Sequence, residues 1–353
     1  MNKYVYSFIH ISLFASVIVC TCCGQVSIGK VLDIEHKTVD RIDYSAQFVY
    51  QDSADRYWFV SPKGLYKKSA STISLYDINA SLNGLRFIST QEDKQGTLYF
   101  DTPEGILIYN NAIFSLLAPE EARIREQWAG NPTDLWFSMG WNRAGPYRFD
   151  GHNLFQHPIP KNVDHEVKAN INQNLSYNPY GIYTIFIDSQ SRIWFGTASM
   201  GIYRYDHKNL QWMYENELSN TPQGGSFGIR SILEDEENNY WINKADFKYT
   251  DARSNDLTDL ISYEKMPGFP SMGNQYFLSM TIDKENRIWM ISYESGIWLI
   301  DGDKIRHYPI KIDGQQIKLW NVLCDKNGKI WINSHKHGCF VFDGYSFLKV
   351  FQE

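Results

Sequence analysis

Short apolar runs separated by polar turns recur along the chain, and residues 185–206 show the pattern clearly. An apolar run ends there at Asp188, a polar turn follows, and apolar residues resume at Ile193 and again after Gly201. Apolar runs of this length between tight turns are typical of antiparallel β-strands. The segment therefore predicts three short strands joined in chain order.

An aromatic residue marks the same position in seven such units. In six of them an Asp precedes the aromatic by six residues, and a Gly, Asn, Asp or Ser stands three residues after that Asp; the third unit has Gly130 instead. An Asp side chain can accept hydrogen bonds from the backbone of the turn that it opens, and Gly or Asn tolerates a left-handed conformation there. The aromatic anchors are Trp58, Tyr99, Trp136, Trp194, Trp241, Trp289 and Trp331, and the aspartates are Asp52, Asp93, Asp188, Asp235, Asp283 and Asp325.

The spacing of the units predicts the architecture. From Trp58 to Trp331 six intervals cover 273 residues, a mean of about 45, which lies within the range of four-stranded propeller blades. Asp-Gly pairs at 150–151, 301–302 and 343–344 are strong hairpin signals between the last two strands of their units. We therefore predict an all-β fold, a seven-bladed β-propeller of four-stranded antiparallel blades, as a single domain over residues 25–353.

The last unit already has its own fourth strand, at residues 347–351. Ring closure is therefore expected from side-chain packing of the last blade on the first, with residues 26–45 as a further contributor.

Residues 1–24 have the features of a secretory signal peptide: Lys3, a mostly apolar stretch over residues 8–19, and small residues before position 25. The apolar stretch is too short to span a membrane as a helix. Cleavage after Gly24 would release a soluble protein. Residues 19–22, Val-Cys-Thr-Cys, also loosely resemble a bacterial lipobox, which would give a lipidated N-terminal Cys. Both routes predict an exported protein, attached to a membrane at most through an N-terminal lipid.

Two of the five cysteines, Cys324 and Cys339, lie beyond the signal peptide. An even pair in an exported protein raises the alternative of a disulfide. The two residues fall on the first and third strands of the last unit, however, and alternate strands of a sheet lie about 9–10 Å apart. That separation exceeds bonding distance, so a buried pair of free thiols is expected.

The repeated pattern also resembles a known family. Its features are the Asp, a Gly or Asn three residues later in most units, the Ile-Trp pair, a Thr or Ser, and a final Gly-Ile-Tyr-x-Tyr-Asp-like run. Residues 188–206 show this pattern, with Ser191 at the turn position. This is similar to the two-component-regulator propeller repeat, which builds the periplasmic sensor half of many hybrid histidine kinases in Bacteroidetes-type bacteria. The resemblance covers residues 45–351. It implies a propeller that binds on one face, in the periplasm or as an outer-membrane lipoprotein of a Gram-negative bacterium.

The family's sensors usually continue into a second propeller, an immunoglobulin-like module, a membrane helix and a kinase. None of these follows in this sequence, so a kinase or transcriptional role is not expected. The net charge of −6 and the lack of a basic stripe also argue against a nucleic-acid partner.

Several motifs are interpreted as structural. Residues 224–228, Gly-Gly-Ser-Phe-Gly, match a nucleophile-elbow string, but a strand rather than a helix is expected after them. Two histidines spaced by one residue, His335 and His337, lack a fixed third metal ligand. The acidic turn at residues 234–237 is expected to be a solvated turn, with a calcium site as the lesser alternative. We therefore predict no catalytic residue, no metal and no cofactor.

The candidate ligand site comes from the start of each first strand. Six residues before each Asp, or before Gly130 in the third unit, the sequence is apolar, whereas the next position is mixed. Side chains alternate along a strand, so the mixed column should face the central channel. Arginines beside aromatic rings suit an anionic or carbohydrate ligand, because the guanidinium offers a planar fork of donors and the rings offer stacking area. The candidates are Arg125, Tyr183, Arg230 and Trp320, with Trp141, Asn142 and Arg143 from the enlarged loop of the third unit and His335 and His337 from the last unit.

The alternative is that these residues plug the channel structurally, but two buried arginines would then each need a partner. The sequence thus favours a monomeric, exported, non-catalytic binding or sensor protein, whose partner is a small molecule, a glycan or another protein. One alternative is a lyase that resembles the streptogramin lyases, with His335 or His337 and Glu294 as its acid–base pair. A purely structural interaction scaffold is the other.

Overall fold

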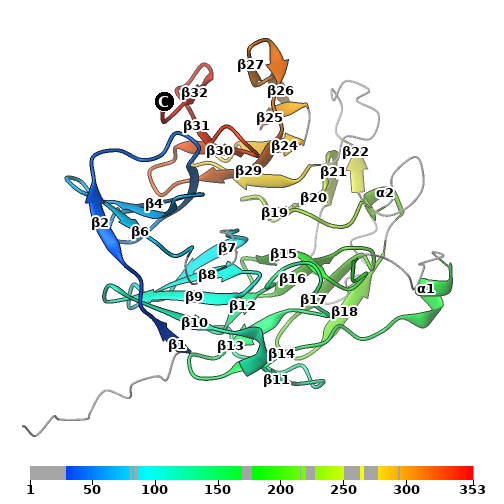
Figure 1. The fold of residues 1–353 in the computed structure, drawn as a ribbon. Helices are drawn as coiled ribbons and strands as arrows, with labels where there is room; N and C mark the ends of the chain where they lie inside the picture. Colours follow the sequence, from blue (N-terminus) through cyan, green and yellow to red (C-terminus); the bar gives the residue numbers. More distant parts are fainter. Residues whose placement is uncertain are drawn as a thin grey trace, which may run out of the picture.

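The strands of the computed structural model form seven sheets of four or five strands each and one two-stranded hairpin. The sheets follow one another around a ring in chain order, so that the C-terminal sheet, red in Figure 1, lies near the first sheet, in blue. The all-β propeller fold predicted from the repeats is confirmed. The structure describes residues 29–79, 82, 86–168, 177–214, 216–219, 227–249, 263–265, 277–292 and 295–352.

Six sheets contain the predicted meander of four antiparallel strands. The first contains β3 (Gln47–Gln51), β4 (Tyr57–Ser61), β5 (Gly64–Lys68) and β6 (Ile73–Tyr76), and the second contains β7 (Ser89–Glu92), β8 (Leu98–Thr102), β9 (Gly105–Asn110) and β10 (Ile113–Leu117). The fourth contains β15 (Ile182–Ile187), β16 (Ile193–Thr197), β17 (Ile202–Tyr205) and β18 (Leu210–Met213).

The remaining three meanders complete the ring. The fifth sheet contains β19 (Ile232–Glu234), β20 (Tyr240–Ile242), β21 (Lys244–Tyr249) and β22 (Tyr263–Lys265), and the sixth contains β23 (Ser279–Ile282), β24 (Ile288–Ser292), β25 (Gly296–Asp301) and β26 (Lys304–Tyr308). The last contains β29 (Leu319–Cys324), β30 (Ile330–Ser334), β31 (Cys339–Phe342) and β32 (Phe347–Lys349). Outside the sheets lie the hairpin β27 (Lys311–Ile312) and β28 (Gln315–Gln316), a 3-10 helix (Pro119–Glu121), α1 (Val163–Lys168) and α2 (Asn216–Ser219).

The third sheet is built differently. It contains β12 (Leu135–Phe137), β13 (Tyr147–Phe149) and β14 (Leu154–Gln156), and its fourth strand, β11 (Arg123–Ile124), pairs parallel with β14 at the outer edge. No described strand occupies the inner position of this sheet. The prediction of seven four-stranded antiparallel blades is therefore wrong for this unit, and six blades have the predicted construction.

The missing Asp of the third unit explains the difference. Gly130 has no side chain to seat the turn, and Asp134 closes a turn of its own by accepting the Asn131 N–H at 2.8 Å. The indole Nε1 of Trp136 consequently has no hydrogen-bond partner among the described residues. Without the turn that precedes the anchor, the segment before it is not held against the second strand.

In the other six units each Asp does more than open a turn. Asp188 accepts the backbone N–H of Gln190 at 3.0 Å and of Arg192 at 2.8 Å, and its other oxygen accepts the Nε1–H of Trp194 at 2.8 Å. The other five aspartates repeat these bonds, with the Tyr99 hydroxyl as donor to Asp93. The third turn residue has a positive φ in every case, from 57° at Asn286 to 85° at Gly328. One side chain thus fixes both the turn and the buried anchor.

Side chains close the ring between the last sheet and the first. Asn333 on β30 accepts the Phe48 N–H at 2.8 Å and donates to the Phe48 carbonyl at 2.7 Å. The Phe48 ring stacks on Trp331 with a centroid separation of 4.6 Å. The backbone N–H of Lys326 also donates to Gln51 Oε1 at 2.7 Å. These contacts agree with closure by packing of the last blade on the first.

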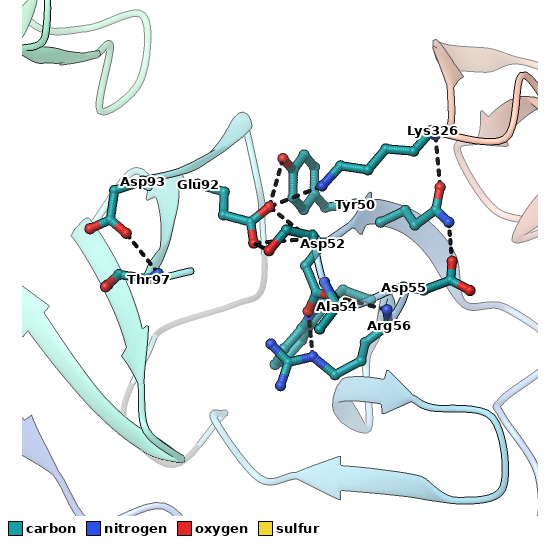
Figure 2. A network of polar contacts seen from close by, with 12 residues as sticks. Tyr50, Asp52, Ala54, Asp55, Arg56, Glu92, Asp93, Thr97 and Lys326 are labelled. Atoms are coloured by element: carbon teal, nitrogen blue, oxygen red, sulfur yellow. Dashed lines mark hydrogen bonds and ion pairs between the residues drawn. The ribbon is translucent and has the colours of Figure 1, made fainter. Parts of the chain in front are cut away.

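The residue before the repeated Asp joins neighbouring blades. Glu92 accepts the Ser53 N–H at 2.9 Å, Lys326 Nζ at 3.1 Å and the Tyr50 hydroxyl at 3.3 Å (Figure 2). Glu234 accepts the Ser189 N–H in the same way, at 2.6 Å. The carboxylate of one blade therefore binds the turn of the preceding one, and through Lys326 the last, first and second blades are connected.

Residues before the first blade extend two sheets. Strand β1 (Lys30–Leu32) pairs antiparallel with β10, and β2 (His36–Val39) pairs antiparallel with β6. Each adds a fifth strand at the outer edge of its sheet. The segment thus covers the outside of the first two blades.

Cys324 and Cys339 are both free, with β30 between their strands, as predicted. Cys339 is buried, but Cys324 is only partly buried, so the predicted burial is confirmed for Cys339 alone. The signal-peptide prediction for residues 1–24 lies outside the described residues. Within the described part of the chain, no helix is long and apolar enough to cross a membrane.

Candidate functional site

Two neighbouring cavities lie where the first strands of the sheets meet. First strands of adjacent sheets contact each other around the ring, so they form its inner wall (Figure 1). The larger cavity has a volume of about 660 Å³ and the smaller about 250 Å³. Seven residues line both cavities and therefore form the boundary between them: Arg86, Phe87, Ile88, Trp141, Trp320, Asn321 and Leu323.

Arg86 lies between two tryptophans at this boundary. Its guanidinium carbon is 4.0 Å from the ring centroid of Trp141 and 5.0 Å from that of Trp320. Trp141 and Trp320 remain 38% and 36% exposed as residues, which leaves room for a ligand to stack on their rings. Within the described part of the chain, Arg86 makes no hydrogen bond or ion pair, and cation–π contacts alone hold its charge in place.

Arg230 is the second cation of the site. Its guanidinium carbon lies 4.2 Å from the Tyr183 ring centroid and 5.1 Å from that of Phe227, and its Nε donates to the Phe227 carbonyl at 3.2 Å. The Arg230 N–H donates to Asn243 Oδ1 at 2.8 Å, which fixes the backbone. Among the described residues no carboxylate pairs with Arg230.

Burial makes the charged form of both arginines less favourable. Burial lowers the pKa of both guanidinium groups, and the charge of Arg230 lowers the pKa of Arg86 further. Both side chains line the smaller cavity. The site is therefore cationic, with aromatic rings beside each charge.

The turn that carries Trp141 is held by the neighbouring blade. Asp101 on β8 accepts the N–H groups of Ser138 at 2.8 Å and Met139 at 2.9 Å, and the Ser138 hydroxyl at 3.1 Å. Met139 has a φ of 48°, in the left-handed region. Burial of Asp101 raises its pKa to about 6. A buried carboxylate thus fixes the loop from which Trp141 reaches the channel.

Five of the predicted site residues line the cavities. Trp141, Tyr183, Arg230 and Trp320 line the smaller one, and His335 lines the larger, with its ring 6.5 Å from that of Trp320. Sequence reasoning missed Arg86. It lies two residues before the mixed column of its unit, and residues two apart on a strand point the same way. An Arg at that place in an otherwise apolar stretch was the signal available.

The placement of Arg125 at the channel mouth is wrong. Arg125 follows β11 at the outer edge of the third sheet, where its N–H donates to the Gln156 carbonyl at 2.8 Å and its guanidinium lies 5.2 Å from the Phe155 ring centroid. The preceding residue, Ile124, is 68% exposed rather than buried in the channel. The repeat register fails here because Gly130 cannot seat the turn on which that register depends.

Three further candidates do not line either cavity. Asn142 is exposed, Arg143 donates from Nη2 to the Pro103 carbonyl at 3.4 Å, and the His337 N–H donates to Ser334 Oγ at 2.7 Å. No group of three or more His, Cys, Asp or Glu side chains within the described residues is placed to hold a metal ion. Glu294 and residues 224–226 lie outside the described residues.

Comparison with known proteins gives one sequence match and a set of structural matches. The family model described as two component regulator propeller matches residues 176–199. No curated protein matches the chain. The extracellular domain of BT4673 from B. thetaiotaomicron, described as a hybrid two-component system, has a TM-score of 0.60 at 18% identity and covers 90% of this chain. This chain spans only 40% of the length of that domain.

Two other propellers are similar at comparable distance. A catalytically inactive virginiamycin B lyase from Staphylococcus aureus, solved with quinupristin, has a TM-score of 0.56 at 15% identity, covering 86% of this chain and 96% of the lyase. PorZ of Porphyromonas gingivalis, a surface component of the type-IX secretion system, has a TM-score of 0.52 at 14% identity, covering 87% of this chain and 46% of PorZ. At these identities the matches establish the fold alone. The resemblance seen in the sequence is confirmed: the chain carries the two-component regulator propeller repeat on a propeller fold like that of extracellular sensor domains.

Proposed function

We propose that this chain is an exported, non-catalytic sensor-type propeller that binds a polar or anionic small molecule or a glycan in the two channel cavities. The observation that carries the proposal is the pair Arg86 and Arg230, each held by aromatic rings and neither paired with a carboxylate of the described residues. A structural plug would be expected to pair its charges, because an unpaired buried charge is costly.

The size of the site supports a ligand rather than a single ion. The larger cavity, at about 660 Å³, falls within the range of small-molecule sites, about 300–1,000 Å³. Trp141 and Trp320 offer partly exposed ring faces, on which a sugar or another flat apolar group can stack. His335 and Asn333 add polar groups to the wall of the larger cavity.

The repeat and the extracellular sensor neighbours support the sensor-type assignment and an export location, in the periplasm or on the outer membrane as a lipoprotein. A monomer that passes its signal to a separate partner protein fits this proposal.

The lyase alternative needs a histidine and a free carboxylate on the same wall. Among the described residues that line the cavities, His335 is the histidine and Asp325 the carboxylate. Both oxygens of Asp325 are already engaged, one by turn N–H groups and the other by Trp331 Nε1 at 2.8 Å. This arrangement favours binding over catalysis.

The test is a thermal-shift screen of the purified chain against acidic and neutral oligosaccharides, followed by calorimetric titration of any compound that raises the melting temperature. Trp320→Ala should weaken binding about 5–150-fold, since a stacked ring contributes roughly 1–3 kcal/mol. Arg125→Gln, at the outer edge, is the control and should bind like wild type. Unchanged binding in Trp320→Ala, together with a lower melting temperature, would favour the structural scaffold instead.

A further inference from the structure

The smaller cavity is a cationic chamber whose lining contains no carboxylate side chain. Arg86 and Arg230 line its approximately 250 Å³, and its other polar residues carry hydroxyl or amide groups. None of its lining residues is an Asp or a Glu: the polar ones besides the arginines are Ser138, Tyr183, Thr184, Ser231, Ser279 and Asn321.

The carboxylate behind the wall does not neutralise the chamber. Asp101 does not line the cavity, and it accepts three hydrogen bonds from Ser138 and Met139. The hydrogen bonds of the Asp101 carboxylate are therefore directed to the turn that carries Trp141. The two guanidinium groups remain the dominant charges at the cavity surface.

The chamber also offers an oriented amide donor. Asn333 donates its Nδ2 to Asn321 Oδ1 at 2.7 Å, and the contacts of Asn333 with the Phe48 backbone fix which of its atoms is the donor. Asn321 must therefore present its oxygen to Asn333, which leaves its Nδ2 without a partner among the described residues. The Thr184 hydroxyl likewise makes no hydrogen bond within the described part of the chain. Two neutral donors thus accompany the two cations.

We propose that the smaller chamber binds a doubly charged tetrahedral oxyanion, the phosphate group of a phosphomonoester, while the rest of the ligand occupies the larger cavity. The inference rests on the proposed function, because it assigns the charged end of the same ligand.

Geometry and charge both favour a phosphate over a carboxylate. A planar carboxylate has one edge that a guanidinium fork can bind through both oxygens, so it can pair with one arginine in this bidentate way. A phosphate presents three terminal oxygens, so two arginines from different blades and the two neutral donors can bind different edges. Two unpaired cations are also neutralised by one dianion, whereas a carboxylate leaves one positive charge uncompensated.

Methyl phosphate and methyl sulfate are the probes, because they have nearly the same shape but differ by one charge at pH 8. Calorimetric titration at constant ionic strength should show methyl phosphate binding at least about tenfold more tightly than methyl sulfate. Arg86→Gln and Arg230→Gln should each weaken methyl phosphate about 10–100-fold, which corresponds to the loss of charge-assisted hydrogen bonds. Arg125→Gln removes the same charge at the outer edge and should leave binding unchanged.

A second comparison varies the charge of the probe itself. Lowering the pH from 8 to 5 protonates methyl phosphate to a monoanion, since the second pKa of a phosphate ester is about 6. Its affinity should then fall towards that of methyl sulfate. Methyl sulfate does not titrate in this range, so any change in its own affinity corrects for protonation of protein groups such as Asp101. Arg230→Lys keeps the charge but loses the fork and should bind with intermediate affinity, a test that remains if Arg230→Gln does not fold.

Equal affinity for the two probes at pH 8, or methyl phosphate binding that survives both Gln variants, would overturn the phosphate assignment. Such a result is separable from failure of the proposed function. His335 lines only the larger cavity, so His335→Ala should weaken an oligosaccharide found in the screen while leaving methyl phosphate binding unchanged. Oligosaccharide binding without any response to methyl phosphate would overturn the subsite alone.

Discussion

Two buried titratable side chains near the irregular third sheet should give the free energy of unfolding opposite dependences on pH. Burial raises the pKa of the Asp101 carboxyl to about 6, above its ordinary value of 3.8. Burial, and then the charges of Arg148 and Arg125, lower the pKa of His157 to about 4, below its ordinary 6.5. Both side chains are at most 1% exposed, so solvent does little to screen these effects.

The signs follow from which state binds the proton. Between about pH 4 and pH 6 the folded state holds a proton on Asp101 that the unfolded state has lost, so this group destabilises the fold as the pH rises. Over nearly the same interval the unfolded state protonates His157 while the folded state does not. His157 therefore stabilises the fold as the pH rises, and that contribution is lost as the pH falls towards 4.

The two contributions nearly cancel in the wild type. A shift of one pKa unit corresponds to about 1.4 kcal/mol, so each group changes the free energy of unfolding by about 3 kcal/mol across its interval. Asp101→Asn removes the group whose contribution to stability falls as the pH rises. The free energy of unfolding of this variant, relative to that of wild type, should therefore rise with pH by up to about 3 kcal/mol. His157→Gln should show the opposite trend, by a similar amount. Each variant is less stable overall, and only its slope against pH is diagnostic.

Urea unfolding at half-unit steps from pH 4 to pH 7 measures these slopes, because the free energy of unfolding extrapolates linearly from the denaturant series. Subtracting the wild-type curve from each variant curve removes the contributions of other carboxylates. Difference curves that are flat for both variants, or that slope in the same direction, would refute the reasoning. The double variant should restore a pH dependence close to that of wild type.

Two other predictions concern ring closure and the thiols. Asn333→Ala leaves the buried Phe48 N–H and carbonyl unpaired, so it should lower the free energy of unfolding by about 2–5 kcal/mol in the same urea assay. The control is Asn142→Ala, in an exposed loop, which should change the free energy of unfolding by less than about 0.5 kcal/mol. Burial raises the pKa of Cys339 to about 12 and that of Cys324 to about 11. Neither thiol should therefore react appreciably with a disulfide reagent at pH 8 until the protein unfolds. Rapid labelling of Cys339 in the native state would contradict its burial.

The fold could be predicted where its cause is local. Asp188 bonds residues two, four and six positions away, so the whole device lies within one stretch of sequence and recurs visibly in every unit that has it. The same holds for the left-handed residue three positions after the Asp. The third unit could not be predicted from the shared register, because Gly130 removes the side chain that the register depends on.

The site was harder to predict because its contacts are not local. Arg86 meets Trp141 and Trp320 across three blades, and no spacing along the chain brings those positions together. The column argument found Tyr183 and Arg230, since both lie on the regular first-strand pattern. It misplaced Arg125, since the strand that would have carried it to the channel is absent from the third sheet.

The irregular unit contributes to the site for a physical reason. In the regular blades, the segment after the second strand is short and turns directly into the third strand, as at Pro62 and Lys63 between β4 and β5. In the third unit nine residues separate β12 and β13, from Ser138 to Pro146. Such a loop would move unless something fixed it, and Asp101 of the second blade does so by binding its first two N–H groups. Trp141 can therefore stand at the boundary of the cavities with a partly exposed ring, supported by a neighbour rather than by its own blade. Local rules fail at this unit, and such failures are expected at functional sites, where the geometry serves binding rather than stability.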